Sequence, residues 1–304
     1  MRKKIILIRI FLVLLFTTSI FARDFPIISS PNADFTNDIV YYIDKVEFPS
    51  EKNATYIIYY LEFFMKSLKT EKSSKDSLFH AKIYMKIKVI DTKTNEVVKT
   101  EELKRSLTAT VISTTSSHIE YFGLELNPGS YKISIEIYDC YPDADGNFPE
   151  GTKSMPYAEE FSIESRSNNE VSISDPIIAS APISPAKKVD TDFVLNGVYV
   201  YPNVQHVISR QFPISLFFTI GNLKRISGNA RVEVEYKITK DGIDYYFIRE
   251  VFDTKFSDII HPVNPRLFSS VYSLPVGKYN INVKVKDLNG QNNSSKDIKI
   301  NLIK

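Results

Sequence analysis

The sequence predicts an all-β protein built from two tandem immunoglobulin-like (Greek-key) β-sandwich domains, and three observations support this prediction. Apolar and polar residues alternate along most of the chain, as in strands with one buried face, and no segment beyond the first 22 residues sustains a helical stripe. A turn followed by a strand that starts with tyrosine occurs twice. A segment rich in proline and alanine separates the two copies.

The repeated motif predicts a specific local structure. The first copy reads Leu-Asn-Pro-Gly-Ser-Tyr over residues 126–131, and the second reads Leu-Pro-Val-Gly-Lys-Tyr over residues 274–279. An alternating strand that closes on aspartate follows each copy. In Greek-key sandwiches, such a tyrosine forms a tyrosine corner, in which its hydroxyl ties the strand to the preceding turn. We therefore expect Tyr131 and Tyr279 to be corner residues of two separate domains.

The first 22 residues have the organisation of an export signal. Residues 1–4 are basic, residues 5–16 are apolar except for Arg9, and a cleavage site follows at Ala22. The apolar run is too short and too basic for a good spanning helix, although an uncleaved anchor remains the alternative. We expect an exported bacterial protein, periplasmic or on the cell surface, with no stable membrane span after the signal is cleaved.

Charge and cysteine content narrow the function classes. The chain has 38 basic and 36 acidic side chains, but the signal contains four of the basic ones, so the mature chain has a net charge of −2. A near-neutral chain lacks the clustered basic surface from which nucleic-acid binding starts. The single cysteine, Cys140, excludes an internal disulfide, so stability must come from core burial.

The first domain is expected to cover residues 23–180. Residues 55–64 form a nearly continuous apolar run, which is typical of a strand covered on both faces. A turn at residues 91–95 predicts a hairpin between its neighbouring strands. The expected strands besides the corner strand cover residues 39–43, 55–64, 80–91, 96–98, 107–119, 159–163 and 171–175.

A linker and the second domain follow. Residues 181–192 form the expected Pro/Ala linker, because proline favours an extended backbone without donors. The second domain is expected over residues 193–304, where Asp241-Gly242 predicts a two-residue hairpin turn. Its expected strands besides the corner strand cover residues 193–200, 213–220, 231–238, 245–248 and 296–302.

An acidic turn at residues 139–150 is the best candidate for a metal site. Asp143, Asp145 and Asn147 alternate as the oxygen ligands of calcium loops do. The pattern departs from an EF-hand because Phe148 stands where glycine is required and Ser154 where glutamate is required. A solvated hairpin loop that uses these residues for backbone reasons is the favoured interpretation.

The sequence predicts no catalytic residue and no cofactor. It has no Gly-x-Ser-x-Gly motif, and its four histidines are scattered without zinc-like spacing, as expected of surface or strand-end residues. The leading expectation is a non-enzymatic scaffold or adhesion module that binds another envelope or extracellular protein. A glycan-binding module that uses Tyr59, Tyr60, Tyr245 or Tyr246 is one alternative. A metal-dependent enzyme at the acidic turn is the other.

Three segments of the first half resemble a bacterial family. Ile-Asp-Lys-Val-Glu-Phe at residues 43–48 with Tyr-Ile-Ile-Tyr-Tyr-Leu-Glu at 56–62, the corner at 126–139, and Val-Ser-Ile-Ser-Asp-Pro-Ile-Ile-Ala at 171–179 carry the resemblance. They are similar to the N-terminal β-sandwich region of GWxTD-motif-containing exported proteins, over roughly residues 39–179. The chain has no tryptophan, so the naming motif itself is absent. The resemblance implies an exported β-sandwich region and carries over no functional residue.

Overall fold

The structure is a computed structural model that describes residues 27–28, 35–50, 53–167, 169–180, 183–187, 192–195, 197–212, 214–262 and 274–304. The fold is all-β, as predicted: within these ranges strands dominate, and no α-helix occurs. The expected export signal lies outside the described residues. No helix in the described part of the chain is long and apolar enough to cross a membrane.

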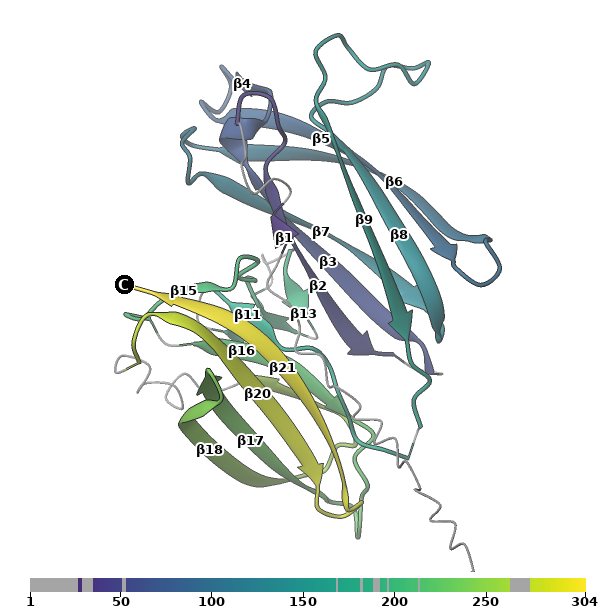
Figure 1. Cartoon of the computed structure of the whole chain (residues 1–304), viewed down its shortest axis with the longest axis vertical. Coiled ribbons are helices and arrows are strands. Elements are labelled where there is room, and N and C mark those ends of the chain that lie inside the picture. Colours follow the sequence, from purple (N-terminus) through teal and green to yellow (C-terminus); the bar gives the residue numbers. More distant parts are fainter. Residues whose placement is uncertain are drawn as a thin grey trace, which may run out of the picture.

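Two sheets form the N-terminal half (Figure 1). The inner N-terminal sheet has the order β1-β2-β3-β7, and the outer N-terminal sheet has the order β4-β5-β8-β9 with β6 also paired to β5. A 3-10 turn, η2 (Met65–Ser67), follows β3. The strands are β1 (Ile27–Ile28), β2 (Tyr41–Pro49), β3 (Thr55–Phe64), β4 (Thr70–Lys72), β5 (Phe79–Asp91), β6 (Val97–Ala109), β7 (Ser117–Leu126), β8 (Gly129–Tyr138) and β9 (Ser154–Ile163).

The C-terminal half contains two larger sheets and a small one. The inner C-terminal sheet consists of β10, β11, β16 and β19, the outer C-terminal sheet has the order β15-β21-β20-β17-β18, and the small sheet has the order β12-β14-β13. The strands are β10 (Ser172–Ile173), β11 (Ile177–Ala179), β12 (Ser184–Pro185), β13 (Val194–Leu195), β14 (Val198–Tyr199), β15 (Val207–Ser209), β16 (Ser215–Gly221), β17 (Ala230–Lys240), β18 (Ile243–Thr254), β19 (Ile259–Pro262), β20 (Gly277–Asp287) and β21 (Asn292–Ile303).

Each half has its own apolar core between its inner and outer sheets. In the N-terminal half, Ile57 and Leu61 of β3 pack in one cluster with Ile87 of β5 and Ile135 of β8. In the C-terminal half, the cluster joins side chains of β10, β11 and β16 in the inner sheet to those of β17, β20 and β21 in the outer sheet. Alternation along each strand turns every second side chain into its core, which is the physical basis of the period-2 pattern.

Both tyrosine corners are confirmed. The Tyr131 hydroxyl donates a hydrogen bond of 2.9 Å to the backbone carbonyl of Asn127, and the Tyr279 hydroxyl donates one of 2.7 Å to that of Pro275. Each acceptor lies four residues before its tyrosine, at the turn that precedes β8 or β20. The two repeated phrases therefore build the same local structure.

The predicted hairpin turns are also present. The Asp91 amide donates to the Glu96 carbonyl at 2.9 Å, which closes the β5–β6 turn, although β6 is much longer than the predicted strand at residues 96–98. Asp241 and Gly242 have φ angles of 51° and 78° between β17 and β18. Two successive positive φ angles are the requirement of a type I′ hairpin turn.

The segment at residues 172–179 pairs within the C-terminal half. Ile173 of β10 lies opposite Ile220 of β16, and Ile178 of β11 lies opposite Leu216. In the expected linker, β12 pairs with β14 through Pro185 and Val198. The domain boundary at residues 180–192 stays a prediction, but the sheet of the C-terminal half takes up strands that precede it.

Candidate functional site at the junction of the two halves

The junction is an apolar contact between the outward faces of the two inner sheets. Ile58 and Tyr60 of β3 point away from the N-terminal core, and Phe217 of β16 points away from the C-terminal core. They meet in one buried cluster, which we call the junction cluster. Its buried members are Val46, Ile58, Tyr60, Ile119, Ile177, Ala179, Val200, Val204 and Phe217. The junction explains why β3 and β16 are apolar on both faces.

Aromatic side chains continue this contact at its edge. The ring centroids of Tyr60 and Tyr121 lie 6.2 Å apart, those of Tyr121 and Phe193 lie 5.5 Å apart, and those of Phe193 and Tyr201 lie 5.0 Å apart. The first two residues belong to the inner N-terminal sheet, and the last two flank the small sheet. This row of rings therefore crosses from one half to the other.

A buried polar pair also joins the halves. His206 Nε2 lies 3.1 Å from Asp44 Oδ2, and His206 Nδ1 lies 3.0 Å from the Lys299 carbonyl. His206 is 1% exposed and Asp44 is 7% exposed. His206 precedes β15, so it is a strand-end histidine, but it is buried, whereas the sequence also favoured a surface position. A buried, hydrogen-bonded pair of this kind fixes orientation, because losing either partner leaves a polar group in the interior.

A second polar contact lies at the other end of β2. The Glu47 amide donates to Asp175 Oδ2 at 2.9 Å, the Asp175 amide donates to the Glu47 carbonyl at 2.9 Å, and Lys296 Nζ lies 2.7 Å from Asp175 Oδ1. Burial and then the neighbouring Asp175 carboxylate raise the pKa of Glu47, although Lys45 and Lys296 partly offset them. Glu47 is therefore easier to protonate in the folded protein than in the unfolded chain.

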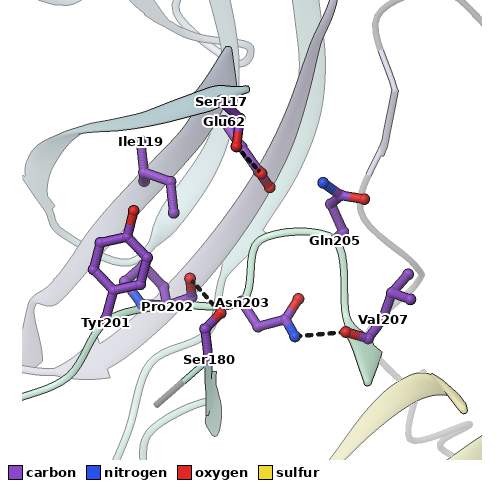
Figure 2. Close-up of a pocket in the computed structure, with 9 residues that line it drawn as sticks. All are labelled: Glu62, Ser117, Ile119, Ser180, Tyr201, Pro202, Asn203, Gln205 and Val207. Atoms are coloured by element: carbon purple, nitrogen blue, oxygen red, sulfur yellow. Dashed lines mark hydrogen bonds between the residues drawn. The ribbon is translucent and has the colours of Figure 1, made fainter. Parts of the chain in front are cut away.

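A cavity of about 300 Å³ opens beside the junction cluster (Figure 2). The inner N-terminal sheet contributes one wall, and the segment before β15 contributes the other. The lining residues are Glu62, Ser117, Ile119, Ser180, Tyr201, Pro202, Asn203, Gln205 and Val207. A smaller cavity of about 190 Å³ shares Ser117, Ile119 and Tyr201 with it and extends to Tyr121 and Phe193.

The polar groups of the cavity are held in defined positions. Ser117 Oγ donates to Glu62 Oε1 at 2.6 Å, Ser180 Oγ donates to the Pro202 carbonyl at 3.3 Å, and Asn203 Nδ2 donates to the Val207 carbonyl at 2.7 Å. Figure 2 shows the Asn203 side-chain oxygen turned toward the cavity. Burial, then the nearby Glu62 carboxylate, raises the pKa of the Tyr201 hydroxyl. The polar lining therefore offers acceptors at Glu62 and Asn203, together with the Tyr201 hydroxyl and the Gln205 amide, which can also donate.

The acidic turn forms a compact loop. Asp143 Oδ1 accepts hydrogen bonds of 2.9 Å from the backbone amides of both Asp145 and Asn147. Phe148 stacks on Tyr138 with ring centroids 4.1 Å apart and planes 13° apart. The described residues contain no group of three or more His, Cys, Asp or Glu side chains that could hold a metal ion. Metal binding by Asp143, Asp145 and Asn147 stays a prediction, and the hydrogen bonds favour a structural role for Asp143.

The tyrosines considered as glycan platforms have different environments. Tyr59 lies in the N-terminal core and Tyr60 in the junction cluster, so neither can offer a ring to a sugar. Tyr246 packs against the C-terminal core, whereas Tyr245 is exposed on β18. Of the four, Tyr245 is the most exposed, and its ring packs edge-on against that of Tyr279 with centroids 5.6 Å apart.

Sequence reasoning missed the residues of the junction. Glu62, Asn203 and His206 come from segments about 140 residues apart, and a single sequence contains no signal that they meet. One local signal was available, because Glu62 interrupts an otherwise apolar run in a strand that was expected to be covered on both faces. An acid at such a position indicates a polar cavity or a partner.

Comparison of the chain with protein-family models and with curated proteins finds no match. The resemblance to the N-terminal region of GWxTD-motif-containing proteins therefore stays a prediction.

Proposed function

We propose that this protein is an exported, non-enzymatic scaffold or adhesion module of the bacterial envelope, in which two tandem immunoglobulin-like sandwiches bind another protein. The tyrosine corners and the paired sheets with separate cores support the sandwich assignment. The observation that carries the binding function is the set of exposed apolar side chains on edge strand β18.

Strand β18 lies at the edge of the outer C-terminal sheet and pairs, among the described residues, only with β17. Phe247 and Val251 lie on its outer face, opposite Lys237 and Glu233, and are 53% and 48% exposed, with Arg249 between them. Beyond a bulge, Ile243 near the hairpin turn is 62% exposed. Long edge strands with exposed apolar side chains favour association, and soluble proteins usually protect them. The edge of β18 is therefore a surface suited to a protein partner that adds an extended segment to the sheet.

Other long edge strands of the molecule are better protected. Strand β6 has Lys99, Glu101 and Arg105 in its alternating row, and β9 contains Pro156, which removes a backbone donor. Proteins blunt edges with such charges and prolines. Strand β18 contains no proline, and Phe247 and Val251 remain exposed on either side of Arg249 on its outer face, which favours a binding role.

The junction supports a scaffold because it fixes the two halves. An apolar cluster and the Asp44–His206 pair hold one inner sheet against the other. The β18 surface is then presented at a constant distance from the N-terminal half. Tandem domains with a flexible connection would lack this geometry.

The test is capture from solubilised cell envelope with the mature protein from Arg23 as bait. We expect one protein to be enriched by the wild type and lost by the double variant Phe247→Lys/Val251→Lys. The matched control is Val97→Lys/Val98→Lys, which places the same charges on exposed valines of the protected strand β6. Circular dichroism melting must show that both variants fold. Equal enrichment by all three proteins, or none by the wild type, would refute the assignment of β18.

A glycan-binding module is a second candidate, favoured by the ring of Tyr245, which is 40% exposed on β18. Co-purification of polysaccharide that Tyr245→Ala abolishes, without enrichment of any protein, would support this candidate instead.

A further inference from the structure

The junction cavity has a hydrogen-bonding character that points to a particular ligand. Three side-chain donors of its lining are already used within the protein: the Ser117 hydroxyl on Glu62, the Ser180 hydroxyl on Pro202, and the Asn203 amide on Val207. Glu62 Oε2 and the Asn203 side-chain oxygen remain as acceptors, and the Tyr201 hydroxyl and the Gln205 amide can both donate and accept. A ligand that donates hydrogen bonds therefore finds two acceptors in this space, one of them a carboxylate.

The charge of the cavity has the same implication. Glu62 is only 9% exposed, and the described residues that line the cavity include no lysine, arginine or histidine. The hydrogen bond from Ser117 offsets only part of the cost of burying the Glu62 carboxylate, because buried charges in proteins are normally paired with an opposite charge. A cation placed beside Glu62 would supply the missing partner and form a charge-assisted hydrogen bond.

The remaining walls suit an aliphatic chain and a cationic head. Ile119, Pro202 and Val207 give apolar surface, the ring of Tyr201 lines both cavities, and the rings of Tyr121 and Phe193 line the smaller one. Aromatic faces attract ammonium groups, and methylene groups gain from apolar contact. A volume of about 300 Å³ lies at the lower end of the range for small-molecule sites.

We propose that the junction cavity binds a primary alkylammonium group, with Glu62 as its counter-ion and Asn203 as a second acceptor. Two sources have this chemistry: a free aliphatic diamine, and the side chain of a lysine presented by a protein. The cavity is lined by no residue of β18, so this site is separate from the protein-binding surface proposed above and stands or falls independently of it.

The experiment is isothermal titration calorimetry on the full mature chain with 1,5-diaminopentane and with a lysine whose backbone groups are blocked as amides. Pentanoate, which carries the opposite charge on a similar chain, is the ligand control. We expect saturable binding of the amines and none of pentanoate. Tighter binding of the diamine identifies a free amine as the ligand, and tighter binding of the blocked lysine identifies a protein side chain. No binding of either amine would overturn the proposal.

Variants locate the site. Glu62→Gln keeps the shape and the acceptor for Ser117 but removes the charge, and we expect a loss of affinity of roughly ten- to hundredfold. The matched control is Glu160→Gln, an exposed acid of β9 that does not line the cavity, which should bind amines as the wild type does. Equal affinity in Glu62→Gln and the wild type would also overturn the proposal.

A second variant protects the test against misfolding of Glu62→Gln. In Val207→Lys, the new ammonium group reaches into the cavity from β15 and takes the place of the ligand. We expect this variant to fold and to lose amine binding. Val207→Met adds similar bulk without charge, so it should bind amines more tightly than Val207→Lys does. Tighter amine binding by Val207→Lys would contradict an ammonium site.

Discussion

Removing the two corner hydroxyls should destabilise the protein by similar and additive amounts. The perturbations are Tyr131→Phe and Tyr279→Phe, each of which deletes one oxygen and leaves the ring in its cluster. Each substitution removes a hydrogen bond, of 2.9 Å to Asn127 in one half and of 2.7 Å to Pro275 in the other. The two sites lie in different halves and share no partner.

The expected size follows from the fate of the two carbonyls. A typical intramolecular hydrogen bond contributes about 1 kcal/mol net, and a partner left without a bond in a partly buried place raises the cost toward about 2 kcal/mol. At roughly 2–4 °C per kcal/mol for units of this size, each variant should melt some 2–8 °C below the wild type. The double variant should show the sum of the two free-energy changes within about 0.5 kcal/mol.

The assay is urea unfolding followed by circular dichroism, with Tyr56→Phe as the matched control. Tyr56 is 41% exposed, so loss of its hydroxyl should change the free energy of unfolding very little. If Tyr131→Phe and Tyr279→Phe unfold at the same urea concentration as Tyr56→Phe, the corner hydrogen bonds contribute nothing to stability. The hydroxyl of the repeated tyrosine would then have no stabilising role in either half.

Three further predictions concern the junction. Asp44→Ala should cost at least about 2 kcal/mol in urea unfolding, and its combination with His206→Ala should cost less than the sum of the two single variants, because each removes the same buried contact. Burial and the adjacent carboxylate raise the pKa of Glu47, so the ionised side chain destabilises the fold once the pH rises above the pKa of the unfolded chain. Glu47→Gln should therefore be more stable than the wild type at pH 7 and equally stable near pH 3. The opposite trend in urea unfolding would contradict the raised pKa. Phe217→Ala should cost about 3–5 kcal/mol by opening a cavity in the junction cluster, whereas the same change at the exposed Phe256 should leave the melting temperature unchanged.

The sequence predicted those parts of the fold that depend on local chemistry. The corner at Tyr131 needs only a turn, a strand and a hydroxyl four residues from its acceptor, and all three are adjacent in the chain. The turn at Asp241-Gly242 needs residues that tolerate positive φ angles, and aspartate and glycine both do. Alternation along β5, β8 and β20 likewise follows from one buried face per strand.

What depends on distant segments could not be predicted. Residues 172–179 were expected within the first domain because the linker was placed after them, at residues 181–192. Strands β10 and β11 are only two and three residues long, and their pairing with β16 is set by packing. The apolar run of β3 indicated cover on both faces without indicating what covers it. The candidate cavity could not be predicted either, because its walls come from both halves and form only when the two halves pack together.

The amine cavity depends on contact between the two halves, whereas the binding edge of β18 does not. A matched pair of substitutions distinguishes the two sites. Val204→Ala removes two methyl groups from the junction cluster, and Val234→Ala removes the same groups from the C-terminal core. Both valines are fully buried, so each variant should lose about 1–3 kcal/mol of stability. Val204 adjoins Asn203 in the loop that closes the cavity, so its variant alone should lose affinity for alkylamines in calorimetry. Partner capture through β18 should survive in both variants at a temperature where both are folded. If amine affinity falls equally in the two, the cavity responds to stability in general, and the junction does not position it.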